Sequence, residues 1–172
     1  ASARMVRALK RLIGAERGAA LVEFTVLMPL LFALMAGFIE FGMAMQRHHL
    51  VQKSLRDSTR YLAQVPGFDS TTPIDATPCN DTPTGQALIA KNLAIYGNIG
   101  GTGTPKIVGW GYDGVCVIGP TSRSVTFNGV TTEVLVVQMT AQAPYNDVSF
   151  LSILGFTGMT LGGSHEQAYL GN

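Results

Sequence analysis

A long apolar run near the start of the sequence limits what this chain can form. From Phe24 to Ile39 it reads FTVLMPLLFALMAGFI, sixteen residues without a charged side chain. As a helix the run would be about 24 Å long. An extension to Met45 would reach about 33 Å, more than the roughly 30 Å of bilayer hydrocarbon. The extension includes Glu40, which we expect near one interface, where a carboxylate can be hydrated. We therefore predict a transmembrane helix that ends near Met45.

The charge distribution predicts the orientation of this helix. Five cations precede the apolar run: Arg4, Arg7, Lys10, Arg11 and Arg17. Four cations follow it and weaken the asymmetry: Arg47, Lys53, Arg56 and Arg60. Because positively charged flanks stay on the cytoplasmic side of a membrane, we expect the N-terminus in the cytoplasm and the rest of the chain on the far side.

The composition excludes two classes of protein. Only 13% of the residues are charged and 47% are hydrophobic, whereas a typical soluble domain is roughly 25% charged. A chain so poor in charge is neither intrinsically disordered nor built to bind nucleic acid, so we expect no nucleic-acid partner. The net charge of +1 also conceals that the basic character belongs to residues 1–18.

Three interpretations of the apolar segment are open. It could be a secretory signal, with Gly42 and Ala44 as the small residues before a cut that leaves Met45 first. It could be a signal anchor that is never processed. In the third interpretation the chain is cut earlier, after the glycine that ends the basic segment, and the apolar helix stays in the membrane.

The third interpretation depends on the residues around Glu23. The string RGAALVEF, residues 17–24, places a glutamate at the fifth position after Gly18. It resembles the cleavage site of type IV prepilins. More specifically, residues 17–63 resemble the TadE-like segment of tight-adherence (Tad, Flp) pilus systems. Ten positions match that pattern in order: Arg17, Gly18, Val22, Glu23, Phe24, Pro29, Gly37, Glu40, Phe41 and Gly42.

The resemblance implies a minor pilin or pseudopilin of a Tad-type (type IVc) pilus. Residues 1–18 would be a basic leader, which a prepilin peptidase removes by cutting between Gly18 and Ala19. Residues 19–45 would be the transmembrane and assembly helix. In an assembled bundle Glu23, followed by Phe24, would pair with the N-terminal amine of a neighbouring pilin, because either charge alone would be costly in an apolar core.

The resemblance also implies partners and a location. The expected partners are the prepilin peptidase, other pilins or pseudopilins, the inner-membrane Tad assembly platform and membrane lipid. The protein would cross the bacterial inner membrane once, with residues 46–172 in the periplasm, and would enter or prime an extracellular pilus that serves surface adherence. The alternative is an unprocessed, membrane-anchored or secreted adhesive domain with no assembly role, which leaves Gly18 and Glu23 without a function.

The rest of the chain predicts an α+β, pilin-like fold. The long helix should loosen or break at Pro29 and stop before Pro66-Gly67, and its distal half should pack on a small antiparallel sheet. Asn128-Gly129 is a strong hairpin signal. Further elements are expected as a helix over Thr84–Tyr96, strands over Lys106–Trp110, Val115–Ile118, Ser122–Phe127, Val130–Ala143 and Thr157–Tyr169, and a short helix or apolar patch over Asp147–Leu154.

Cys79 and Cys116 are the two cysteines of the chain. In a domain outside the cytoplasm they favour a disulfide, which on the chain-entropy view would contribute about 3–4 kcal/mol. Two free buried thiols are the alternative.

The sequence contains no pattern that predicts catalysis. His48 and His49 are neighbours on a helix and point in different directions, so they cannot chelate one ion together. His165 and Glu166 are neighbours in a predicted strand and face opposite sides. The glycine-rich run 97–103 follows a helix and precedes a strand, the reverse of a phosphate-binding loop. We therefore expect no enzyme, no metal and no cofactor.

Overall fold

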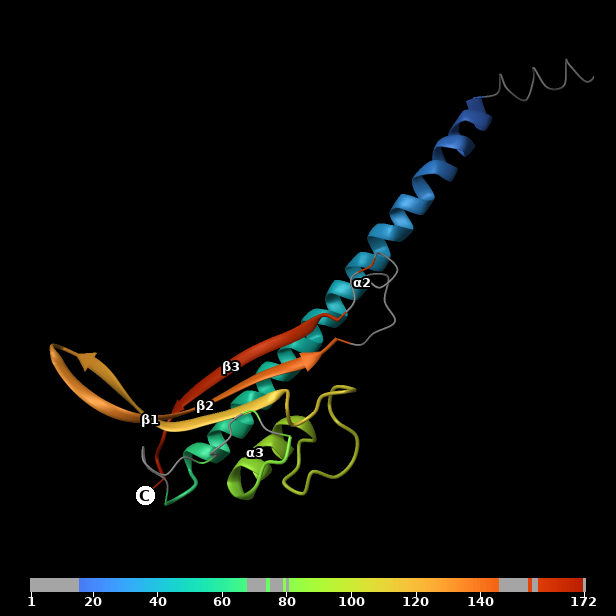
Figure 1. The fold of residues 1–172 in the computed structure, drawn as a ribbon. Helices are drawn as coiled ribbons and strands as arrows, with labels where there is room; N and C mark the ends of the chain where they lie inside the picture. Colours follow the sequence, from blue (N-terminus) through green and yellow to red (C-terminus); the bar gives the residue numbers. More distant parts are fainter. Residues whose placement is uncertain are drawn as a thin grey trace, which may run out of the picture. The chain divides into compact units, whose positions relative to one another are not determined.

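The computed structural model describes residues 16–67, 74, 79, 81–145, 155 and 158–171. The chain divides into two compact units, Ala1–Gly42 and Met43–Asn172, called here the N-terminal unit and the distal unit. The elements are two helices, α2 (Glu16–Ala63) and α3 (Gly85–Ile95), and three strands, β1 (Val115–Phe127), β2 (Val130–Pro144) and β3 (Thr160–Ala168) (Figure 1). The predicted α+β fold, a long apolar N-terminal helix with a small antiparallel sheet, is confirmed.

Helix α2 continues through Pro29, which corrects the expectation of a helix break at that residue. A proline inside a helix removes one backbone hydrogen bond, to the carbonyl four residues earlier, and the flanking turns can hold the helix together. The helix ends at Ala63, just before Pro66 and Gly67, as predicted. Gly67 has a φ of 88°, a backbone conformation that residues other than glycine rarely adopt.

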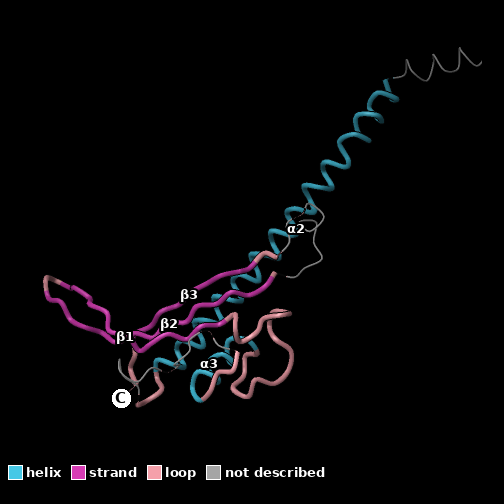
Figure 2. Tube along the Cα trace, viewed as in Figure 1, coloured by secondary structure: helices cyan, strands magenta, loops and turns pink. Residues whose placement is uncertain are grey.

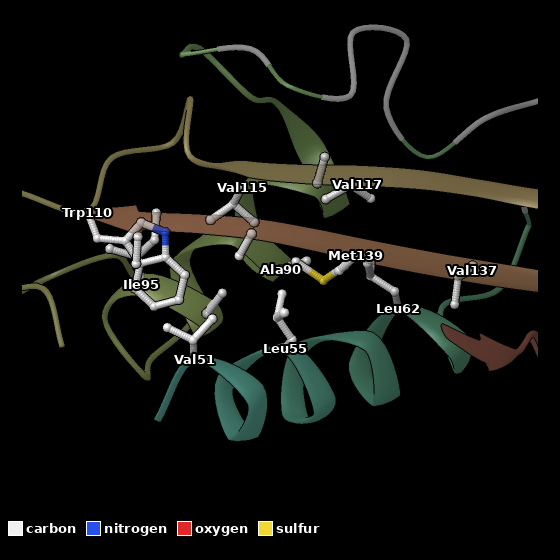
Figure 3. Close-up of a cluster of buried hydrophobic side chains, with 14 of the residues drawn as sticks. Val51, Leu55, Leu62, Ala90, Ile95, Trp110, Val115, Val117, Val137 and Met139 are labelled. Carbon is white, nitrogen blue, oxygen red and sulfur yellow. The ribbon is translucent and has the colours of Figure 1, made fainter. Parts of the chain in front are cut away.

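The hydrophobic core of the distal unit lies between the second half of α2, α3 and one face of the sheet (Figure 3). Val51, Leu55 and Leu62 of α2 are fully buried, and their spacing places them on one side of the helix. Across from them lie buried side chains of β1 and β2: Val115, Val117, Val137 and Met139. Burial of each such side chain stabilises the fold by about 1.5–3 kcal/mol.

The sheet has the order β1-β2-β3, with both pairings antiparallel (Figure 2). The predicted Asn128-Gly129 turn joins β1 to β2, and both residues have positive φ, 49° and 81°, as a tight two-residue turn requires. The two expected strands 115–118 and 122–127 form the single strand β1, with a register irregularity between Ile118 and Thr121. β3 falls within the predicted range 157–169.

The strand expected over Lys106–Trp110 is wrong, because this segment is a loop. Its backbone turns sharply, with the Trp110 amide donating to the Ile107 carbonyl at 3.1 Å, and Gly109 has a φ of 81°. Ile107 and Trp110 are nonetheless buried in the core. The two residues are three apart, so a strand would have placed them on opposite faces, whereas the turn brings both into the core. The element expected over Asp147–Leu154 lies outside the described residues.

Helix α3 lies within the range predicted for it. Its first and last residues are flanked by Thr84 and Tyr96, and Gly97 follows with a φ of 81°. The Gly97 amide donates to the carbonyls of Asn92 and Leu93, at 3.2 and 3.1 Å, which satisfies carbonyl groups at the helix end.

Candidate functional site

The apolar part of α2 carries its hydrophobic side chains on the outside. The exposed large hydrophobic residues of the N-terminal unit are Leu21, Val22, Phe24, Val26, Leu27, Leu30, Leu31, Phe32, Leu34, Met35, Phe38, Ile39 and Phe41. By length and composition α2 is a helix that could cross a membrane. A helix that is apolar all round requires lipid or other helices around it. We therefore expect lipid or other helices to cover the apolar part of α2.

The Gly18–Ala19 peptide bond lies in the first turns of α2, which begins at Glu16. Glycine is a weak helix former, by about 1 kcal/mol relative to alanine, so the helix is locally less stable at Gly18. Cleavage itself stays a prediction.

Glu23 is exposed on the apolar surface of α2, between the exposed side chains of Val22 and Phe24. A carboxylate in such a surface is tolerated where water or headgroups reach it, and needs a cationic partner once lipid or helices cover it. Pairing of Glu23 with the N-terminal amine of a neighbouring subunit stays a prediction.

Glu40 differs from the expectation of a hydrated carboxylate near an interface. Its side chain is only 3% exposed, and it is the one buried acidic residue in the described part of the chain. Sequence reasoning missed this burial because helical spacing alone does not reveal which surfaces become covered.

The β1–β2 hairpin extends past the end of β3 (Figure 1). β3 pairs with β2 only over Val136–Pro144, so residues 122–135 form a two-stranded ribbon, called here the hairpin arm. Hydroxyl groups of Thr126 and Thr131 bond across the arm at 2.9 Å, and Ser122 donates to Glu133 at 2.8 Å. At its tip Phe127 and Val130 are 76% and 66% exposed.

The hairpin arm has the features of a contact surface. Two-stranded ribbons are marginally stable alone, and their outer edges offer unpaired backbone groups to another chain. The Asn128-Gly129 signal predicted the turn. It did not predict that β3 would stop short and leave the arm uncovered.

A disulfide joins Cys79 to Cys116, as expected. Cys116 lies in β1 between two buried valines, on the opposite face of the strand. The bond therefore ties the threonine- and proline-rich segment around Cys79 to the sheet.

The histidines of the described residues do not form a metal-binding site. The rings of His48 and His49 are tilted by 58° with centroids 6.4 Å apart. Glu166, next to His165, pairs instead with Arg123, whose Nε lies 2.8 Å from the carboxylate. Over the described ranges, no three histidine, cysteine, aspartate or glutamate side chains come together to hold an ion.

Comparison with known proteins places a family match on the apolar helix. Residues 18–60 match the model of the family described as TadE-like protein. No curated protein and no solved structure matches the chain. The match begins at Gly18 and includes Glu23, so the resemblance drawn from the ordered set of residues is confirmed over this segment. Residues 18–60, about a quarter of the chain, are thus similar to the TadE-like family.

Proposed function

We propose that this protein is a minor pilin or pseudopilin of a Tad-type pilus, with a structural rather than an enzymatic role. The observation that carries the proposal is the coincidence of the TadE-like match with an exposed apolar helix that bears Glu23 near its start. An ordinary anchor needs apolar length but gains nothing from an acidic residue at this position.

In this proposal the order of events follows from charge. The basic segment 1–18 keeps the N-terminus in the cytoplasm, and the distal unit lies in the periplasm. A prepilin peptidase cuts between Gly18 and Ala19 and creates a positive amine at a helix start. When helices gather, Glu23 of one subunit neutralises the amine of another, which removes the cost of two unpaired charges in an apolar bundle.

The distal unit would supply the contacts that distinguish one subunit from another. The hairpin arm offers unpaired strand edges and an apolar tip at Phe127 and Val130, and a neighbouring pilin is the partner we propose for it. The disulfide would keep the unit folded outside the cytoplasm.

The test is the intact mass and N-terminal sequence of the protein recovered from its native membrane. A chain that begins at Ala19 supports the proposal. A chain that begins at Met45 would mean ordinary secretion of the distal unit. An uncut chain from cells with an active prepilin peptidase would leave the anchored adhesive domain as the function.

A further inference from the structure

A groove rich in cations lies in the distal unit, where α2 leaves the apolar run. Its volume is about 520 Å³. Four of the side chains that line it are basic or can become so: Arg47, His49 and Lys53 of α2, and Lys106 of the loop before β1. Met43 and Leu50 add apolar surface. Of the described residues that line this basic groove, none is acidic.

Lys106 is held in place inside the basic groove. Its Nζ donates to the Ser54 hydroxyl at 2.9 Å and to the Leu93 carbonyl at 3.0 Å. Among the described residues these bonds use two of its three N–H donors, which leaves one for a ligand. Burial lowers the pKa of Lys106. Asp57 raises it and the charge of Lys53 lowers it further. An anion in the groove would offset the free-energy cost of burying the ammonium group and would weaken its repulsion by Lys53.

Arg47 is positioned as well. Its Cζ lies 5.4 Å from the centroid of the Tyr145 ring, a cation–π arrangement. A guanidinium has five N–H donors, so it can hold a phosphate oxygen while it stacks on an aromatic ring.

The place of the groove along α2 favours a lipid over a soluble anion. Along the helix axis Arg47 lies about 3 Å beyond Met45 and Lys53 about 12 Å beyond it. The headgroup layer of a bilayer is roughly 5–8 Å thick on each side, and long basic side chains bend back toward it. Met43, which lies on the membrane side of Arg47, suits the glycerol and upper acyl carbons. A soluble phosphate has no apolar part, so it would gain no binding energy from apolar side chains in the groove.

We propose that the basic groove binds the headgroup phosphate of an anionic phospholipid in the leaflet where α2 leaves the membrane. This inference rests on the membrane anchoring in the proposed function. Bound lipid would hold the distal unit at the membrane surface before assembly, and release from the bilayer would free the groove.

The experiment uses the full chain in uncharged dodecylmaltoside micelles doped with increasing mole fractions of dioleoylphosphatidylglycerol. Native mass spectrometry measures the fraction of chains that retain the lipid. The test variant is Arg47→Gln/Lys53→Gln. The matched control is Arg56→Gln/Arg60→Gln, which removes the same charge from exposed positions on the same helix outside the groove. We expect the half-saturating mole fraction to rise roughly 25-fold in the test variant, about five-fold per cation, and to change less than about two-fold in the control.

Three results would overturn the proposal. Equal loss in both double variants would mean diffuse charge attraction, and equal retention of phosphatidylcholine by the wild type would mean no preference for an anionic lipid. Displacement of the lipid by millimolar inorganic phosphate would mean a site for a soluble anion. If the double variant unfolds, Lys53→Gln alone, at an exposed position, should still show the five-fold change; unchanged binding there would also count against the groove.

A separate measurement distinguishes this proposal from the anchoring on which it rests. After an alkaline wash, the wild type should float with vesicles of pure phosphatidylcholine. A chain that floats but shows no lipid preference overturns the groove alone, whereas a chain that fails to float overturns the membrane anchor.

Discussion

The Nζ of Lys106 lies 2.9 Å from the hydroxyl oxygen of Ser54, which is 52 residues earlier in the sequence and buried on α2. This hydrogen bond joins the loop before β1 to the helix on which the core is built. It also brings a third cation beside Arg47 and Lys53. The hydrogen bond between Lys106 and Ser54 therefore both stabilises the loop and places Lys106 in the basic groove.

Because the pKa of Lys106 is lowered in the folded protein, we predict that the free energy of unfolding changes with pH in the alkaline range. Burial is the main cause, with Asp57 acting against it. The unfolded chain regains the ordinary value of 10.5, so between the two pKa values the unfolded state binds more protons than the folded state. The free energy of unfolding of the wild type, relative to Lys106→Met, should therefore rise as the pH approaches 10.5. Urea unfolding of both proteins at several alkaline pH values measures this difference. A difference that stays constant or falls would contradict the assigned cause.

Glu23→Gln should leave membrane insertion intact and lower incorporation into pili by roughly ten-fold or more, since about 1.4 kcal/mol of lost pairing is a factor of ten. Electron microscopy and immunoblots of sheared pili measure incorporation. Asp57→Asn is the control, because it removes an exposed acid from the same helix beyond the apolar run. Normal piliation by Glu23→Gln would exclude the proposed pairing with a neighbour's amine.

Gly18→Leu should prevent cleavage, so that the recovered chain keeps residues 1–18. A bulky side chain at the residue before the cut would obstruct a site that the resemblance assigns to glycine. Gly37→Ala is the control: an added Cβ at Gly37 meets nothing within 4 Å, so processing should be normal. Intact mass of the membrane-extracted protein separates cut from uncut chains, and a variant cut at the same bond would refute the assignment of Gly18.

Loss of the Cys79–Cys116 bond should lower the free energy of unfolding by about 3–4 kcal/mol, because the bond closes a loop with a sequence separation of 37 residues. The variant Cys79→Ser/Cys116→Ser and the reduced wild type should agree in denaturant titrations. Equal stability of the oxidised wild type and the variant would mean that the disulfide does not constrain the unfolded chain.

Phe127→Ser at the tip of the hairpin arm should change the free energy of unfolding by no more than about 0.5 kcal/mol, because the side chain is 76% exposed. It should nevertheless reduce pilus incorporation if the arm contacts a neighbouring pilin. Ile99→Ser, at another exposed apolar position in the distal unit, is the control. An equal effect of both substitutions on incorporation would rule out a specific role for the arm.

Several features could be predicted because their causes are local. A long apolar run predicts a helix that can cross a membrane, and this prediction does not depend on how the rest of the chain folds. Asn128-Gly129 predicts a tight turn because few residue pairs tolerate two positive φ values. The strand over Val130–Ala143 also has a local cause, since successive side chains of a strand face opposite ways and the buried Val137 and Met139 are two residues apart.

Other features arise only where distant segments meet. The segment Lys106–Trp110 was expected to be a strand, yet Ile107 and Trp110 both enter the core from a turn. Glu40 becomes buried although its neighbours in sequence are exposed. Lys106 joins Ser54 and the cations of α2 through contacts across 52 residues. Local patterns record the preferences of neighbouring residues, whereas burial and charge clustering depend on which surfaces the folded chain brings together.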